Sequence, residues 1–513
     1  MLLGLDVGTS GCKASIFTLD GQLVSFGYRE YSDYSPKPGW IELNPSEVWI
    51  KVQDAIKDAL RKKGCAEELK ALGISSLGEA ILPIDKSGNP LYPAITAYDQ
   101  RSNNYAKTIE MLKHEFGEME LFKVTGIPLN SMPSIHKIVW IKENMPDIYR
   151  KTWKFVCIED FIIYKLTGEA AIDFNLASRT MMLDIFKRRW HPEILNLIDI
   201  SEDLLSNPVP SGTIVGETSS KVSKEIGLPK GLSVATGGHD QGCAALGAGI
   251  GDEGPTMDAT GSVECIASVM KNPVLTEEML KAGHCCHCYT IENMYISLGF
   301  FPSSGLILRW FRDQFAFEER KRAEEEGSNV YDILTELAST SPPTASKLLL
   351  LPHFCGSGTG SQPVLNRNSR GALVGLTIYH KKADVVRAIL EGVAFELKQL
   401  IEHFESSGIK VSELRATGGG AKSPFWLQLK ADVTGKCIYL PSVTETTSLG
   451  AALLAGIGVR AYKSFKDAIE KTYKWREVYK PNEKLNKQYA KIYETYKMLY
   501  PALVNLYESL AII

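Results

Sequence analysis

One short pattern occurs twice in this chain of 513 residues, and it constrains the fold more than any other feature. The two copies are Asp6-Val7-Gly8-Thr9-Ser10 and Asp258-Ala259-Thr260-Gly261-Ser262. An apolar, strand-like run follows each copy, at residues 14–19 and at residues 265–269. Two halves with like beginnings indicate a duplicated architecture. Glycine, threonine and serine in such turns present backbone N–H groups and hydroxyls to one point, which suits a phosphate.

The length of the chain predicts two large domains, because a single hydrophobic core stops growing well below 513 residues. The best linker is the stretch at residues 249–255, which is rich in glycine and ends in proline. We therefore predict an N-terminal domain at residues 1–249 and a C-terminal domain at residues 250–513.

The composition is that of a soluble globular protein, with 44% hydrophobic and 23% charged residues. The net charge of −3 provides no basic field for nucleic acid, and the apolar runs are too short or too interrupted to span a membrane. The first residues lack the basic region of a signal peptide, and ten scattered cysteines fit reduced thiols. We therefore expect a cytoplasmic protein without a nucleic-acid or membrane partner. Symmetric dimers are the commonest assembly, so a homodimer is the expected oligomeric state.

A single carboxylate follows a predicted strand and a glycine turn near the end of the first half. The apolar run at residues 232–235 reaches two glycines, then Asp240, then small residues that begin a helix. Glycines let a ligand approach the backbone, and a helix N-terminus favours negative charge nearby. Asp240 can therefore take a proton from a substrate hydroxyl, or it can simply cap the helix. The local pattern leaves both interpretations open.

Two further turns are candidates for binding a nucleotide. Asp6 ends the first strand, where a carboxylate suits a hydrated Mg²⁺ that takes few protein ligands. A third strand runs into Gly418-Gly419-Gly420, and three consecutive glycines let a flat base and its sugar lie against the backbone. An ordinary hairpin and a tight strand-to-helix turn explain the same residues without a ligand.

Polar residues in the first half are candidates for substrate binding. Asp99 and Arg101 lie two residues apart, so on an extended segment they share one face. Their acceptors and donors suit a polyhydroxylated ligand, but a surface ion pair explains them too. Glu79 lies between two strands that are predicted within residues 72–84.

Helical periodicity predicts helices at residues 134–144, 146–166, 382–404 and 485–510. The run His284-Cys285-Cys286-His287-Cys288 looks like a set of metal ligands. Neighbours on a strand point to opposite faces, however, and no second Cys/His pair lies at zinc-finger spacing. A buried structural strand is therefore favoured over a zinc site.

Taken together, these residues resemble the FGGY family of carbohydrate kinases over nearly the whole chain. The family's first signature is matched by Met132-x-Ser134-x-x-Lys137-Ile138-x-Trp140-Ile141-x-Glu143-Asn144. Its second signature is matched by Gly371-x-Leu373-x-Gly375-Leu376, then Asp384-Val385, then Ala388-Ile389-Leu390-Glu391. Two long patterns in the right order make a chance match implausible. The resemblance implies an α/β fold of two actin-like (RNase H-like) domains, with ATP and a sugar in the cleft between them.

The resemblance also implies roles for individual residues. It makes Asp240 the catalytic base and places Mg²⁺ near Asp6 and Asp240. Glu79 and Asp99 match positions at which members of the family bind substrate, and Arg101 joins them on its local pattern. The residues implied to bind ATP are Thr9, Ser10, Lys13, Thr260, Gly261, Gly418, Gly419, Gly420 and Ala421.

The expected substrate is a ketopentose such as xylulose. The stretch at residues 418–423 and the region of Asp99 look like those of xylulose kinases, although Leu77-Gly78-Glu79 replaces their usual Met-His-Gly. Glycerol kinases have an Arg where this chain has Gly78, before the shared Glu. Kinases for glycerol, erythritol or a sugar acid therefore stay open as alternatives. An actin-like nucleotide-dependent sensor is a further alternative, but such a switch needs no second group of polar residues for a sugar.

Overall fold

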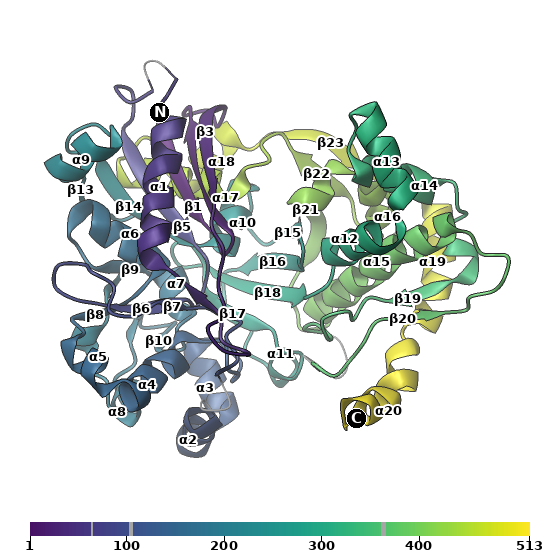
Figure 1. Ribbon diagram of the computed structural model, residues 1–513, viewed down its shortest axis with the longest axis horizontal. Coiled ribbons are helices and arrows are strands. Elements are labelled where there is room, and N and C mark those ends of the chain that lie inside the picture. The colour runs from purple at the N-terminus through teal and green to yellow at the C-terminus, as the bar shows by residue number, and fades with distance from the viewer. Residues whose placement is uncertain (63–64, 102–105, 361–365, 513) are drawn as a thin grey trace.

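A mixed β-sheet forms the centre of each half of the chain, and the two sheets lie in two lobes (Figure 1). In this view the N-terminal lobe, in purple and blue, lies at the left, and the green C-terminal lobe lies at the right. The computed structural model describes residues 1–62, 65–101, 106–360 and 366–512.

Six strands make up the N-terminal sheet. They are β1 (Leu2–Val7), β2 (Gly11–Phe17), β3 (Leu23–Glu30), β5 (Ala71–Ser76), β13 (Ile214–Glu217) and β14 (Ser233–His239). Their order is β13-β14-β5-β1-β2-β3. The first three strands pair antiparallel, whereas β5 lies parallel to β1 and β14 lies parallel to β5.

Seven strands make up the C-terminal sheet. They are β15 (Gly254–Thr260), β16 (Glu264–Met270), β17 (Cys285–Cys288), β18 (Tyr295–Phe301), β21 (Val411–Thr417), β22 (Ile438–Pro441) and β23 (Trp475–Tyr479). Their order is β17-β18-β16-β15-β21-β22-β23. Here β16 pairs antiparallel with both β15 and β18. On the other side of β15, β21 lies parallel to β15 and β22 lies parallel to β21. The central five strands therefore repeat the order and directions of the first sheet, which confirms the duplicated architecture.

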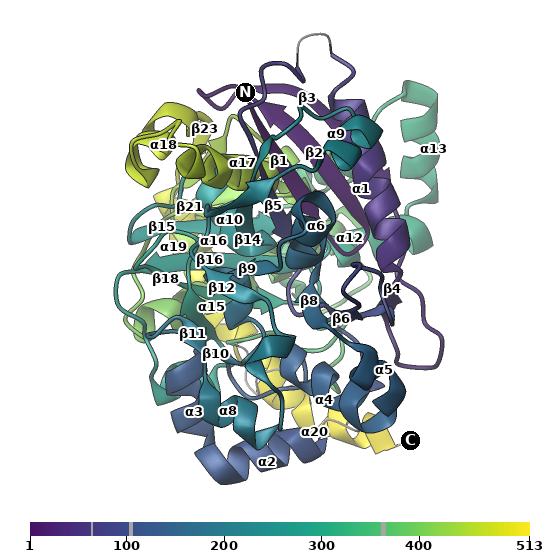
Figure 2. The same cartoon turned by 90° about the vertical axis from the view of Figure 1, so that its left-hand side faces the viewer.

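Helix α17 (Thr446–Gly458) comes from the second half of the chain but covers one face of the N-terminal sheet (Figure 2). Helices α1 (Pro45–Ala59) and α6 (Ile158–Thr167) cover the opposite face. A Cβ at Gly4 of β1 would lie 1.8 Å from the carbonyl oxygen of Ser448, so the helix can pack this closely only on glycine. The N-terminus of α17 is thereby held at the boundary of the two lobes.

Shorter elements complete the N-terminal lobe around a four-stranded sheet of order β4-β7-β6-β8. The strands are β4 (Glu42–Leu43), β6 (Ile81–Ile84), β7 (Ala94–Ile95), β8 (Lys154–Cys157), β9 (Ala171–Asp173), β10 (Leu183–Asp184), β11 (Arg189–Trp190) and β12 (Asn207–Val209). The helices are α2 (Ala106–Phe116), α3 (Glu118–Thr125), α4 (Ser134–Asn144), α5 (Pro146–Lys151), α7 (Phe174–Ser178), α8 (Pro192–Leu197), α9 (Ser220–Ile226) and α10 (Asp240–Gly247). The prediction of one helix at residues 146–166 is wrong, because β8 pairs with β6 and divides it into α5 and α6. Tertiary pairing here overrides the helical spacing of the apolar residues.

The remaining elements belong to the second half of the chain. They are β19 (Leu349–Leu351), β20 (Ala372–Val374), α11 (Glu277–Lys281), α12 (Gly305–Phe315), α13 (Phe317–Glu326), α14 (Val330–Ser339), α15 (Lys382–Ser406), α16 (Pro424–Thr434), α18 (Phe465–Thr472), α19 (Glu483–Tyr496) and α20 (Leu499–Ile512). The predicted helix at residues 382–404 is confirmed as α15, whereas the predicted tail helix is two helices, α19 and α20. In the part of the chain that the structure describes, no helix is both long and apolar enough to cross a membrane.

Candidate active site

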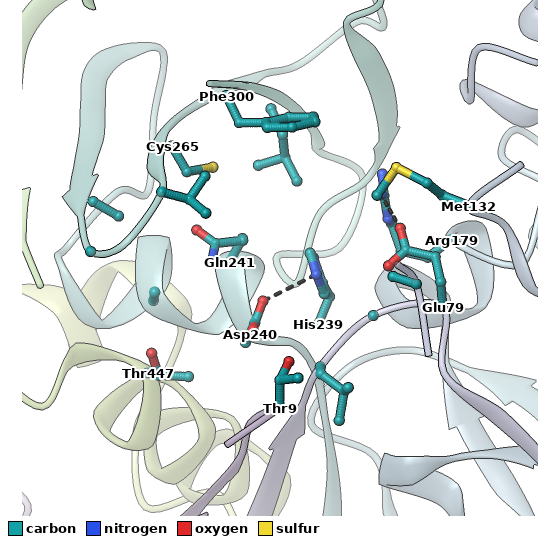
Figure 3. A pocket seen from close by; sticks show the side chains of 18 of the residues that line it. Thr9, Glu79, Met132, Arg179, His239, Asp240, Gln241, Cys265, Phe300 and Thr447 are labelled. Carbon is teal, nitrogen blue, oxygen red and sulfur yellow. Dashed lines mark hydrogen bonds and ion pairs between the residues drawn. The ribbon is translucent and has the colours of Figure 1, made fainter. Parts of the chain in front are cut away.

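A cavity of about 470 Å³ lies between the two lobes, and residues of both halves line it (Figure 3). The N-terminal half contributes the end of β1, the turn after β5, the segment before Asp99 and the start of α10. The C-terminal half contributes the turn between β15 and β16, the end of β21 and the N-terminus of α17. The two repeated turns therefore face one cavity.

Asp240 is the first residue of α10 and lies on the wall of this cavity. Burial raises the pKa of its carboxyl, and the nearby carboxylates of Asp6 and Glu79 raise it further, while His239 acts in the opposite direction. Nε2 of His239 lies 3.0 Å from Oδ1 of Asp240 (Figure 3). A carboxylate with a raised pKa in a sheltered cavity is suited to accept a proton from a hydroxyl.

Buried side chains from α6 and α7 hold the end of β14, directly before Asp240. The backbone N–H of Gly237 donates to Oε1 of Glu159 at 2.7 Å, and that of His239 donates to Oδ1 of Asn175 at 3.0 Å. Both acceptors lie in side chains with no solvent exposure. The position of Asp240 is therefore set by packing outside the strand–turn–helix segment itself.

Asp6 lies at the end of β1 and also lines the cavity. Burial raises the pKa of its carboxyl to about 6, with Glu445 adding to the increase and Lys13 opposing it. The carboxylate of Asp6 also raises the pKa of Asp240, and a divalent cation near the two groups would offset this repulsion. Among the described residues there is no group of three or more His, Cys, Asp or Glu side chains that could hold a metal. A hydrated Mg²⁺ that is bound mainly through water and phosphate oxygens fits this pair, because it takes few protein ligands.

The residues predicted to bind phosphates and nucleotide divide into two groups. Thr9, Gly261 and Gly418 line the cavity. The other predicted residues do not: they are Ser10, Lys13, Thr260, Gly419, Gly420 and Ala421. Ser10 lies at an exposed turn tip, and Gly419 begins a 3₁₀ turn that leads away from Gly418.

Two of these side chains are already engaged elsewhere. The ammonium of Lys13 forms an ion pair with the carboxylate of Glu445, just before α17. The Thr260 hydroxyl is buried and hydrogen-bonded to Lys430 and Glu264. As the molecule stands, Thr260 therefore faces the interior of the C-terminal lobe rather than the cavity.

Glu79 and Arg179 form an ion pair at the other end of the cavity (Figure 3). Glu79 has a backbone φ of +57°, which is unfavourable for a residue with a side chain. Its carbonyl oxygen accepts hydrogen bonds from Nζ of Lys137 at 2.7 Å and from Oγ of Ser134 at 3.1 Å. Lys137 also donates to the carbonyl oxygen of Met132 at 2.7 Å. Two residues of the first signature pattern, Ser134 and Lys137, thus hold the strained residue that presents its carboxylate to the cavity, and Met132 helps to fix Lys137.

The imidazole of His239 fills the space beside Gly78. A Cβ at Gly78 would lie 2.8 Å from the Cδ2 and Nε2 atoms of this ring, so the ring can take this position only beside glycine. Burial lowers the pKa of His239, and Arg179 lowers it further, while Asp240 and Glu79 oppose the change. A neutral ring is therefore favoured between the two carboxylates.

Asp99 and Arg101, predicted to bind substrate, do not line the cavity. The guanidinium of Arg101 donates to both carboxylate oxygens of Asp99, at 2.7 and 2.8 Å, and to Glu42 at 2.7 Å. It lies between the rings of Trp40 and Trp140, 3.9 and 4.6 Å from their centres. Both side chains are buried in this pairing, which offsets the cost of removing their charges from water, and their binding of substrate stays a prediction. Their pairing instead anchors the neighbouring segment 96–98, which does line the cavity.

The cluster from His284 to Cys288 is the buried strand β17 and the residue before it. Its side chains alternate between the two faces of the sheet, and Cys285 alone of these five lines the cavity. In the described part of the chain, these side chains do not form a group of three or more that could hold a metal ion. A structural strand, the favoured interpretation, accounts for this segment.

Several residues on the cavity wall lay outside the sequence prediction. Arg179 is 100 positions from its partner Glu79, so no local pattern could connect them. His239 directly precedes Asp240 and could have been found from that position alone. The segment 444–448 reaches the cavity because α17 crosses to the N-terminal lobe. Its three Thr residues around Glu445 were the feature of the sequence that could have suggested a binding site.

Comparisons with known proteins extend over nearly the whole chain. The model described as FGGY family of carbohydrate kinases, N-terminal domain, matches residues 1–247, and the model of the C-terminal domain matches residues 269–459. The gluconokinase of Bacillus subtilis (strain 168) is 30% identical over 514 residues, with 99% of this chain and 97% of that protein covered. An autoinducer-2 kinase of Yersinia pestis bv. Antiqua (strain Angola) is 31% identical, with 94% and 90% covered. The structure of a xylulose kinase from Lactobacillus acidophilus matches with a TM-score of 0.87 at 24% identity, and 99% of each chain is covered.

Proposed function

Because this chain belongs to the FGGY family of carbohydrate kinases, we propose that it transfers the γ-phosphoryl group of ATP to a primary hydroxyl of a sugar, with Asp240 as the base. The observation that carries the assignment of the base is the position of Asp240 on the wall of the cavity between the lobes. On one side of it lie the turns of Thr9 and Gly261, and on the other side lies the Glu79–Arg179 pair.

In the proposed step the substrate oxygen forms a bond to the γ-phosphorus while the bond from this phosphorus to the ADP oxygen breaks. The hydroxyl proton passes to the carboxylate of Asp240. Phosphoryl transfer asks little covalent chemistry of the protein, so positioning and electrostatics provide most of the rate. A bound Mg²⁺ near Asp6 and Asp240 would neutralise charge on the phosphates.

The charges around the cavity support a neutral substrate. Asp6, Asp240, Glu79 and Glu445 contribute carboxylates, whereas Arg179 is the one Arg or Lys among the described residues of the wall and is already paired with Glu79. A sugar acid would have to approach these carboxylates and compete for Arg179. A neutral ketose can donate a hydroxyl to Glu79 and accept from Arg179 without breaking the pair. We therefore propose a ketopentose such as xylulose as the substrate.

A substrate panel tests this proposal. Purified enzyme with fixed MgATP is offered xylulose, ribulose, erythritol, glycerol and gluconate, and the phosphorylated products are measured by mass spectrometry. We expect the ketopentoses to give the highest kcat/KM and gluconate to give the lowest. Preferential turnover of gluconate would refute the charge argument, and no turnover of any member would favour the nucleotide sensor.

The variant Asp240→Asn tests the assignment of the base. Asparagine keeps the size of the side chain but cannot accept the proton, so we expect phosphorylation to fall at least about 10³-fold. The dissociation constant for ADP should stay within about twofold of the wild-type value, because the change leaves the nucleotide turns intact. An Asp240→Asn enzyme with wild-type turnover would exclude Asp240 as the base.

A further inference from the structure

A buried group of charged side chains lies beneath the turn between β15 and β16, outside the cavity. Nζ of Lys430, on α16, donates to Oδ2 of Asp258 at 2.9 Å and is ion-paired with Glu264. None of the three side chains is more than 1% exposed. Charges are almost never buried this completely unless they are paired, because removing them from water is costly.

Lys430 reaches the turn itself through Thr260. Its ammonium donates to the hydroxyl of Thr260, the last residue of β15 before Gly261. Oε2 of Glu264, which begins β16, accepts a hydrogen bond from Ser304 at 2.6 Å. One ammonium thus joins the last residue of the incoming strand to the first residue of the outgoing strand.

The start of α12 fixes the same turn from its other side. The backbone N–H of Gly305 donates to the carbonyl oxygen of Gly261 at 3.0 Å, and that of Ser304 donates to Ser262 at 2.9 Å. The carbonyl oxygens of Gly261 and Ser262 are therefore occupied within the lobe. This arrangement keeps the turn in one conformation on the cavity wall.

The glycine turn after β21 packs directly on Thr260. A Cβ at Gly420 would lie 2.4 Å from Cγ2 of Thr260, and a Cβ at Gly418 would lie 2.6 Å from its carbonyl oxygen. Helix α16 begins at Pro424, just after this turn, and carries Lys430 back beneath it. Lys430 therefore connects both turns that are proposed to bind the nucleotide.

The charge balance of the group depends on the ammonium. Burial raises the pKa of Glu264 to about 8, with Asp258 adding to the increase and Lys430 opposing it. Burial lowers the pKa of Lys430, but Asp258 and Glu264 outweigh this and raise it. Loss of the ammonium would leave two buried acids without their cation, so they would have to take up protons or rearrange, and the hydrogen bonds that now hold the turn would change.

We propose that Lys430 is a positioning residue for nucleotide binding, because its ammonium holds the 260–263 turn and the 418–421 turn in register. This inference rests on the proposed function, in which these turns contact ATP. It assigns Lys430 no contact with the nucleotide and no part in proton transfer. It predicts that nucleotide affinity, rather than sugar binding, depends on this side chain.

The test compares Lys430→Met with Lys436→Met, which removes an ammonium just after the same helix. Lys436 is partly exposed, pairs with Glu405 and donates to the carbonyl oxygen of Val411. ADP binding is measured by calorimetry, and the KM for xylulose is measured at saturating ATP. For Lys430→Met we expect at least tenfold weaker ADP binding with the KM for xylulose within threefold. Lys436→Met should bind ADP as the wild type does.

A double variant guards against simple misfolding. Lys430→Met with Glu264→Gln removes the ammonium together with one buried carboxylate, so less uncompensated charge opposes folding. If this variant folds and binds ADP with wild-type affinity, the proposal is refuted. An equal loss of ADP and xylulose affinity in the single variant would also refute it, since that pattern indicates general damage. If the wild type binds ADP but does not phosphorylate xylulose, the substrate proposal fails while the ADP comparison still decides the role of Lys430.

Discussion

The clearest perturbation of the substrate end of the cavity is Lys137→Met. Methionine has nearly the length of lysine but cannot donate the two hydrogen bonds to the carbonyl oxygens of Glu79 and Met132. Hydrogen bonds from a charged group contribute about 1.5–3 kcal/mol each. The positive φ of Glu79 costs about 1–2 kcal/mol, so without these bonds the backbone can relax to an ordinary conformation.

A relaxed backbone would turn the Glu79 carboxylate away from Arg179 and from the substrate. If the loss of these hydrogen bonds weakens binding of the sugar in the transition state by about 1.4–2.8 kcal/mol, kcat/KM falls about 10- to 100-fold. Steady-state kinetics with the best substrate of the panel measure the effect. The dissociation constant of ADP should change by less than about twofold, because the nucleotide turns lie at the other end of the cavity.

Lys142→Met is the matched control for this prediction. Lys142 lies on the same helix and also donates to backbone carbonyl oxygens, those of Ile198 and Asp199, but away from the cavity. A folded Lys137→Met enzyme whose kcat/KM matches that of Lys142→Met would refute the reasoning. Equal losses of sugar and ADP binding would refute it as well.

Two further predictions concern pH and packing. Burial raises the pKa of Asp160 from its ordinary 3.8 to about 8. The folded protein therefore holds the proton more tightly than the unfolded chain does, and the stability that this provides is fully present below pH 4 and is lost as the pH rises through 8. One pKa unit is 1.36 kcal/mol, so Asp160→Asn should gain on the order of 5 kcal/mol of unfolding free energy over the wild type between pH 4 and 8. Urea unfolding at several pH values measures this gain. If the stability difference between Asp160→Asn and the wild type did not change with pH, the raised pKa of Asp160 would be contradicted. Gly78→Ala places a methyl group against the ring of His239 and should lower kcat/KM about tenfold or more, since a 1 Å displacement near the reacting atoms is costly. Unchanged kinetics for Gly78→Ala would mean that the ring position does not matter.

Much of the fold could be predicted because its signals are local. The duplicated turns, the strands beside them and α15 are contiguous segments whose periodicity and glycines are visible in the sequence. The position of Asp240 at the start of a helix could be predicted for the same reason, since strand, glycines, acid and helix follow one another directly. A predicted helix was wrong where a strand interrupts it, because β8 pairs with β6 within residues 146–166.

The surroundings of several site residues depend on contacts between distant segments, which the sequence does not show. Asp99 and Arg101 do lie together, but their partners Glu42, Trp40 and Trp140 turn the pair into the protein interior. The spacing of two residues and their types do not show whether their side chains will face the solvent, a cavity or partners in the protein interior.

The sequence by itself determined that two similar α/β halves each carry a turn suited to phosphate and that one acid lies at the start of a helix between them. Only the tertiary structure decided that Arg179 meets Glu79, that Lys430 lies beneath the 260–263 turn, and that the N-terminus of α17 lines the cavity. The physical reason is that turn geometry and helix starts depend on neighbouring residues. The pairing of buried charges depends instead on which distant segments the packing of the whole chain brings together.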